Sequence, residues 1–181
     1  MQIRIDDMPV EGLRLQDRIA ADHLPDLERL AAEGVGRLQT PLDVTLNIIP
    51  VAGMLRVEGK LQTVVGLTCS RCLAEFEDAL ASRFTVTFTR RLPEVNDPAA
   101  EAHELTAEEM GLVLFKGDEI DLRDTLQEQI ILALPMQPIC RPDCRGLCAR
   151  CGANLNQGDC GCSAETVDPR LAVLKQLKLK P

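Results

Sequence analysis

Residues 42–48 read Leu-Asp-Val-Thr-Leu-Asn-Ile, an alternation of apolar and polar side chains. A period of two is typical of a strand that buries one of its faces. The same pattern returns further along the chain, in residues 54–58, 61–68 and 73–89. Pro50, Gly53 and Gly59 separate the first runs. We therefore expect an antiparallel β-meander whose inward face is apolar.

A helical period precedes the meander. Between Asp22 and Glu33, leucine and alanine side chains recur every three or four residues. Asp22 is the candidate N-cap and Gly34 the candidate stop, so the segment predicts a helix. Short strands are expected at residues 1–5 and 112–115, where apolar residues again alternate or cluster.

A second amphipathic helix is expected after Asp121, which is the candidate cap, and before Pro135, which ends it. Its apolar stripe consists of Leu122, Leu126, Ile130, Ala133 and Leu134. Asp168 and Pro169 read as the start of a closing helix. That helix has an apolar side and a basic end, formed by Leu171, Leu174, Leu177 and by Lys175, Lys178, Lys180. The predicted fold class is α+β, with an antiparallel meander packed against helices and a small cysteine-rich zinc module.

The net charge of −8 is unevenly distributed. Residues 137–181 carry seven Lys or Arg and four acids, whereas residues 1–136 carry 13 and 24. Residues 93–109 hold six acids and no Lys or Arg, as expected of an exposed loop that is either simply solvated or docks a basic partner. We expect one α+β domain over residues 1–136, with this acidic loop, and a module over 137–181 that contains the zinc site and the closing basic helix.

The composition limits the cellular setting. Apolar residues make up 45% of the chain, enough for a core, but there are only four Phe and no Tyr or Trp. The sequence contains no apolar run long enough for a membrane span, and its first residues do not resemble a signal peptide. We expect a cytoplasmic protein without membrane contact, in which thiols stay reduced.

The eight cysteines are the strongest chemical signal. Zinc prefers four thiolates in a tetrahedron, and close cysteine pairs in tight turns supply them. One complete set is formed by Cys148, Cys151, Cys160 and Cys162. The remaining four would make a second site joining the tip of a hairpin to the start of the cysteine-rich module, namely Cys69, Cys72, Cys140 and Cys144.

Two other uses of these cysteines stay open. A single site could take Cys140 or Cys144 in place of one member of the first set and leave the remaining thiols free. We therefore expect at least one zinc site, and two if all eight cysteines bind metal. A redox pair at Cys69 and Cys72 is less favoured, because reactive Cys-x-x-Cys motifs sit at helix N-termini and this one falls in a predicted hairpin.

Enzyme chemistry finds little support. The two histidines, His23 and His103, have no nucleophile or base partner in a recognisable motif, and no nucleotide-binding loop occurs. Arginines interleave with the cysteines, either to contact RNA phosphates or to balance the negative charge of zinc–thiolate centres. They are Arg71, Arg141, Arg145 and Arg150.

Three stretches together resemble the YceD family, the large ribosomal RNA subunit accumulation proteins. They are Val65-Gly-Leu-Thr-Cys-Ser-Arg-Cys-Leu73, the segment 121–156 with its Gly-Leu-Cys-Ala-Arg-Cys-Gly motif at 146–152, and Asp168-Pro-Arg-Leu-Ala-Val-Leu-Lys-Gln-Leu177. Cys69 and Cys72 match the paired cysteines of that family. The resemblance implies a role in the accumulation of 23S ribosomal RNA in bacteria, and in ribosomal RNA processing in plastids.

The resulting functional hypothesis is a non-enzymatic factor for production of the large ribosomal subunit, built on a zinc-stapled scaffold. Its expected partners are a basic ribosomal protein or a large-subunit precursor, with ribosomal RNA as a further partner through the C-terminal basic helix. The alternative is a redox-linked zinc switch or holdase chaperone, whose thiols would release metal on oxidation.

Overall fold

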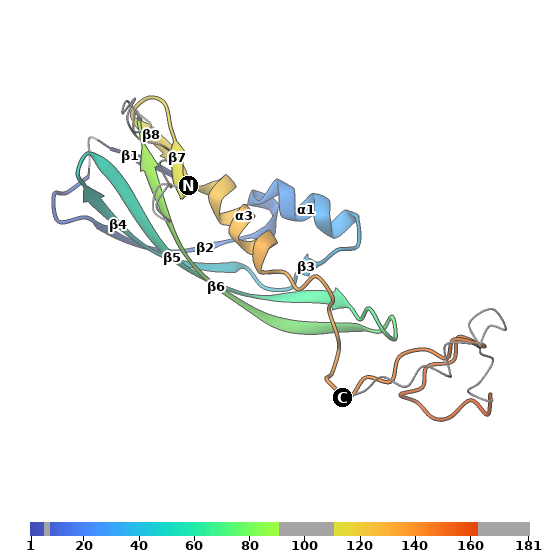
Figure 1. Ribbon diagram of the computed structural model, residues 1–181. Coiled ribbons are helices and arrows are strands. Elements are labelled where there is room, and N and C mark those ends of the chain that lie inside the picture. Colours follow the sequence, from blue (N-terminus) through green and yellow to red (C-terminus); the bar gives the residue numbers. More distant parts are fainter. Residues whose placement is uncertain (6–7, 91–110, 163–181) are drawn as a thin grey trace, which may run out of the picture.

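The computed structural model describes residues 1–5, 8–90 and 111–162. Within these ranges the main sheet has the order β2-β4-β5-β6-β7, and β3 pairs with β5 (Figure 1). The strand bounds are β2 Leu13–Ile19, β3 Arg37–Leu38, β4 Leu42–Val51, β5 Met54–Thr68, β6 Glu75–Thr89 and β7 Leu112–Leu114. Two shorter strands, β1 Gln2–Arg4 and β8 Glu119–Asp121, form a separate pair.

The antiparallel meander is confirmed for β4, β5 and β6. β4 and β5 are joined by Ala52 and Gly53, both at positive φ, the type I′ geometry that suits a two-residue hairpin. The main sheet as a whole is mixed, because β7 pairs with β6 in parallel. A parallel neighbour requires a connection of a dozen or more residues, and the chain between β6 and β7 is long enough to supply one.

Two of the expected strand breaks are wrong. Pro50 lies inside β4 near its end, and Gly59 lies inside the continuous strand β5. Gly59 is directly opposite Phe84 on β6, and a Cβ at position 59 would overlap the Phe84 ring. The glycine therefore gives the aromatic ring room against the sheet and does not interrupt the strand.

The first helix, α1 Pro25–Ala32, begins later than the sequence predicted. Asp22 belongs to a short 3-10 turn over Ala21–His23 and caps nothing. Pro25 sets the start, because its fixed φ and missing N–H suit the first helical position. The stop at Gly34 is confirmed: Gly34 has φ +77, and the N–H of Val35 donates to the Leu30 carbonyl at 3.0 Å.

The second helix, α3 Arg123–Ala133, carries the expected apolar stripe. Leu122 takes the N-cap position instead of Asp121, which ends β8. The Asp121 carboxylate nevertheless accepts the backbone N–H of Arg123 at 3.0 Å and that residue's guanidinium. The predicted N-cap is therefore wrong by one residue, although the Asp121 carboxylate still bonds to the first residue of the helix.

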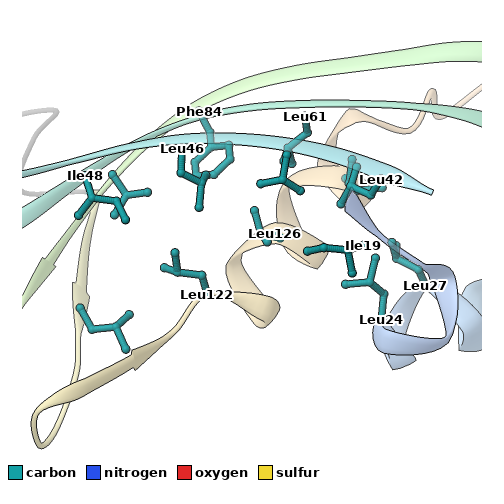
Figure 2. Close-up of a cluster of buried hydrophobic side chains, with 14 of the residues drawn as sticks. Ile19, Leu24, Leu27, Leu42, Leu46, Ile48, Leu61, Phe84, Leu122 and Leu126 are labelled. Carbon is teal, nitrogen blue, oxygen red and sulfur yellow. The ribbon is translucent and has the colours of Figure 1, made fainter. Parts of the chain in front are cut away.

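Both helices cover one face of the main sheet (Figure 1). Inward side chains of β4 and β5 meet those of α1, of α3 and of the segments before them, as Figure 2 shows for Leu46 and Leu61 above Leu126. Leu24, Leu42, Leu46, Leu61 and Leu126 are fully buried. This aliphatic layer confirms the α+β class, and most side chains on the opposite face of the sheet are polar.

The cysteine-rich segment lies beyond the turn between β5 and β6, away from both helices (Figure 1). The acidic segment 93–109 and the closing helix expected at 168–177 fall outside the described residues. The division of the chain at residue 136 stays a prediction. Neither helix of the described part has the length and apolar character needed to cross a membrane.

Candidate metal centres

The turn between β5 and β6 is built on Cys69-Ser-Arg-Cys72. The N–H of Cys69 donates to the Ala74 carbonyl at 2.9 Å, and the N–H of Leu73 donates to the Cys69 carbonyl at 2.9 Å. Leu73, the residue after the second cysteine, has φ +59. These bonds curl the backbone so that both sulfurs belong to one cluster. The turn lies at the tip of a hairpin, as the sequence predicted.

The segment Cys148-Ala-Arg-Cys151 repeats this turn almost bond for bond. Cys148 donates its N–H to the Ala153 carbonyl at 2.8 Å, and Gly152 donates to the Cys148 carbonyl at 2.9 Å. Gly152 has φ +73 and stands where Leu73 stands in the first turn. Two stretches of chain with different neighbours therefore adopt the same local structure, and their Cys-x-x-Cys spacing is one that occurs in structural metal sites.

Each turn meets a second pair of cysteines. Cys69, Cys72, Cys140 and Cys144 form what we call the inner cluster, and Cys148, Cys151, Cys160 and Cys162 the outer cluster. In each cluster the four sulfurs lie within 4.8 Å of one another. Three members of the inner cluster are buried, whereas Cys151 of the outer cluster is exposed and its companions are half-buried.

The sulfur separations in the inner cluster match a metal site better than a disulfide. The Sγ atoms of Cys69 and Cys144 are 3.8 Å apart, and those of Cys72 and Cys140 are 3.7 Å apart. A tetrahedron with Zn–S bonds of about 2.3 Å has edges of about 3.8 Å between its sulfurs. A disulfide would hold two sulfurs at about 2.05 Å. Each cluster could thus hold a metal ion.

The pKa values of the inner thiols also favour a metal site. Backbone N–H groups, first that of Cys140 and then those of Cys72 and Arg71, lower the pKa of the Cys69 thiol to about 6. Burial, followed by the neighbouring sulfurs, raises the pKa of Cys140 to about 12. The first thiolate therefore forms easily and the last only with difficulty, because negative charge accumulates. A bound dication would remove that penalty.

The outer cluster likewise contains one thiol with a lowered pKa and one with a raised pKa. Backbone N–H groups of Cys151 and then Arg150 lower the pKa of Cys148 to about 6. The sulfurs of Cys151 and Cys160 raise the pKa of Cys162 to about 12. Gly161 between the last two cysteines has φ +72, which allows such closely spaced residues to turn toward one centre.

Backbone contacts attach the hairpin tip to the cysteine-rich segment. The N–H of Ser70 donates to the Pro138 carbonyl at 2.8 Å, and the N–H of Leu147 donates to the Arg71 carbonyl at 3.1 Å. The Arg71 guanidinium also donates to the Cys144 carbonyl at 3.1 Å. This arginine therefore has a structural contact beside the inner cluster.

Sequence reasoning missed Asn156, which connects the two clusters. Its Nδ2 donates to Cys144 Sγ at 3.3 Å, while its Oδ1 accepts the backbone N–H of Arg145 at 2.8 Å and the guanidinium of Arg141 at 2.9 Å. The sequence Asn-Leu-Asn at 154–156 is typical of a turn. Nothing local indicated that its amide would reach a sulfur of the other cluster.

Arg145 likewise has a partner in the module, because its guanidinium bonds to Asp159 at 2.6 Å. Of the two histidines weighed as catalytic groups, His23 is exposed beside Asp22, and His103 falls outside the described residues. The described fold and its clusters define a sheet-rich α+β protein with two four-cysteine sets, each built on a Cys-x-x-Cys turn.

The family model of the large ribosomal RNA subunit accumulation protein YceD matches residues 57–178, a range that includes both clusters. The chain belongs to this family. It is 26% identical over 157 residues to the chloroplastic YCED homolog 1 of Arabidopsis thaliana, covering 77% of this chain and 49% of that protein. No solved structure matches it.

Two bacterial relatives are also similar. An uncharacterized protein of Mycobacterium tuberculosis is 32% identical over 137 residues, covering 75% of this chain and 61% of that protein. The large ribosomal RNA subunit accumulation protein YceD of Haemophilus influenzae is 31% identical over 114 residues, covering 62% of this chain and 61% of that protein. The chain spans about half to three fifths of the length of these relatives.

Proposed function

We propose that this chain is a non-enzymatic factor that supports production of the large ribosomal subunit in the bacterial cytoplasm. It acts in the accumulation or processing of 23S ribosomal RNA by binding protein and RNA on a zinc-stapled scaffold. Membership of the YceD family supports the ribosomal part of the proposal. The observation that carries the scaffold part is the spacing of the inner sulfurs, 3.7 and 3.8 Å, which equals the edge of a zinc–thiolate tetrahedron.

In this proposal each cluster holds one zinc ion and the metal has a structural role. The inner ion would close the long stretch of chain between Cys72 and Cys140 and so fix the hairpin tip to the cysteine-rich segment. Closing a loop of that length with a metal removes entropy from the unfolded chain, an effect of several kcal/mol. Four protein thiolates leave no open position for substrate, which fits a structural ion better than a catalytic one.

Metal analysis combined with affinity capture tests both parts. Full-length protein purified without oxidant is expected to contain two zinc ions per chain and to capture large-subunit precursors or a basic ribosomal protein. A folded, metal-free protein would rule out the zinc scaffold. Capture of no large-subunit component by zinc-loaded protein would rule out the ribosomal role.

The acidic segment supplies the proposed contact for a basic partner. Replacing Glu101, Glu104, Glu108 and Glu109 with Gln should weaken capture of large-subunit components, because a block of negative charge attracts basic proteins. A matched control replaces four exposed acids elsewhere, Glu11, Glu28, Glu33 and Glu128, with Gln. Equal capture by the two variants would remove the acidic segment from the proposal.

The exposure of Cys151 favours a second candidate, the redox-linked zinc switch or holdase chaperone. An exposed thiolate is open to oxidation, and its loss would release the outer ion. Mild peroxide in a zinc-release assay separates the two functions. A structural site should keep its metal, whereas a switch should release one equivalent and gain activity in suppressing aggregation of an unfolded protein.

A further inference from the structure

The face of the main sheet that helices α1 and α3 leave uncovered carries a positive patch, in a chain whose net charge is −8. We call this patch the outer sheet face, formed by the outward positions of β2 and β4, of β5 up to Gln62, and of β6 from Ala81. It holds five cations and two acids. The cations are Arg14, Arg18, Arg56, Lys60 and Arg83, and the acids are Asp43 and Glu58.

Both acids of this face are already paired. Asp43 bonds to Arg18 at 2.6 Å, and Glu58 lies 3.4 Å from Arg56. The other three cations, Arg14, Lys60 and Arg83, are exposed and have no ionic or hydrogen-bonded partner within the described residues.

Two of these unpaired cations oppose each other directly. Lys60 on β5 is the cross-strand partner of Arg83 on β6. Like charges in that position destabilise a sheet. A bound anion between them would turn this repulsion into attraction for the ligand, so the pair is better explained as part of a binding surface than as a contribution to folding.

The shape and the remaining side chains suit a chain of phosphates. An open depression of about 410 Å³ is lined by Arg14, Thr45, Asn47, Glu58, Lys60 and Arg83. From β2 to β6 the patch crosses three interstrand gaps, roughly 14 Å in all. Each nucleotide of an RNA strand carries one negative phosphate, so a strand that crosses the patch can bring more than one phosphate to its cations. Hydroxyl and amide groups between the cations can donate to phosphate and sugar oxygens.

We propose that the outer sheet face binds the sugar–phosphate backbone of RNA. The proposal rests on the function proposed above and names the surface through which it meets ribosomal RNA. Phe84 borders the depression but is only 9% exposed and packs into the core, as Phe88 does, so neither offers an exposed ring on which bases could stack. Recognition is therefore independent of sequence and depends on charge. The protein's overall negative charge is screened beyond about 8 to 10 Å at physiological salt, so the local patch governs the contact.

Binding of a labelled single-stranded RNA of mixed sequence, about 20 nucleotides long, to the zinc-loaded full chain tests this surface. Three phosphate contacts give a slope of about −2 for log affinity against log salt, a loss of about 20-fold between 50 and 200 mM. Replacing Arg14, Lys60 and Arg83 with Gln should abolish most of the binding and flatten the slope. A control that neutralises Arg4, Arg29 and Lys116 changes the net charge equally and should bind like the wild type.

A second variant separates binding from folding. Lys60→Glu places an acid opposite Arg83, which should favour pairing of β5 with β6 while RNA binding falls about 10-fold or more. Unchanged RNA affinity in this variant or in the triple variant would overturn the proposal. Displacement of the RNA by an equal charge concentration of polyglutamate would also overturn it, in favour of an acidic protein partner.

Capture of large-subunit precursors distinguishes this proposal from the broader function. If the wild type captures precursors and the triple variant captures them equally well, the surface is wrong and the ribosomal role stands. If the wild type captures none, the ribosomal role fails whatever the RNA measurements give. Loss of capture in the triple variant but not in the charge-matched control supports both.

Discussion

Asn156 Nδ2 donates a hydrogen bond to Cys144 Sγ at 3.3 Å, joining the loop of the outer cluster to a sulfur of the inner one. The same amide group accepts the backbone N–H of Arg145 through its oxygen. The loop that orders the outer cysteines therefore also orients an inner sulfur. Groups that hold metal ligands in this way affect metal affinity although they do not touch the ion.

We predict that Asn156→Ala lowers the zinc affinity of the inner cluster by about 10- to 100-fold, because Cys144 loses a donor that stabilises its thiolate. Competition with a graded series of chelators measures the change. Gln157→Ala, an exposed neighbour in the same loop, is the matched control. Equal zinc release from the two variants would show that Asn156 is only a turn residue.

Leu73 offers a prediction about stability. It holds φ +59 with its side chain 64% exposed, in the position that glycine takes in the equivalent turn. A left-handed conformation costs a non-glycine residue roughly 1–2 kcal/mol, while glycine costs more to order on folding. Leu73→Gly should therefore raise the free energy of unfolding by up to about 1 kcal/mol.

The reverse change tests the same reasoning. Gly152→Leu places a side chain at φ +73 and should lower the free energy of unfolding by about 1–2 kcal/mol. Urea unfolding of the zinc-loaded proteins measures both variants. A loss of stability in Leu73→Gly would mean that the leucine side chain contributes contacts that outweigh its backbone strain.

The two clusters should contribute unequally to stability. Cys72→Ser and Cys151→Ser should each reduce the zinc content from two ions to one. Cys72→Ser should lower the free energy of unfolding by several kcal/mol, because the inner ion closes the long loop between the hairpin and the cysteine-rich module. The outer variant should lose protection only in residues 145–162, as measured by amide hydrogen exchange. Equal losses over the whole chain would contradict separate roles.

Asp121 gives a pH dependence with a defined sign. Hydrogen bonds from the Arg123 guanidinium, followed by that residue's N–H and the terminal ammonium of Met1, hold the pKa of Asp121 well below its usual range. A lowered folded-state pKa means that its stabilisation is present above about pH 4, the unfolded value, and is lost as the pH falls further.

Asp121→Asn should accordingly be less stable than the wild type at neutral pH, and the difference should shrink below about pH 4. Chemical denaturation of both proteins over this range measures it. Zinc loss in acid affects both proteins alike and cancels in the comparison. A difference that stays constant down to the acid end would show that the carboxylate's charge is not responsible.

Local patterns allowed much of this fold to be predicted. The alternation in residues 42–48 and the helical stripe from Leu122 to Leu134 each reflect which face of one element is buried, so they can be read from neighbouring residues alone. Strand β2 was missed although Leu13 and Leu15 alternate with polar residues, because its second half turns polar at an edge of the sheet. Gly59 was misread because its reason, the ring of Phe84, lies on another strand.

The sequence by itself determined the alternating runs of the meander, the amphipathic character of helices α1 and α3 and the two Cys-x-x-Cys turns, since each depends on residues close together in the chain. The sequence left two divisions of the eight cysteines open, and only the tertiary structure placed Cys69 at 3.8 Å from Cys144, 75 residues away. It also placed Lys60 opposite Arg83, on the face of the sheet away from helices α1 and α3. The reason is that spacing along the chain encodes local geometry, whereas strand register and backbone contacts such as Ser70 to Pro138 set the distances between remote groups.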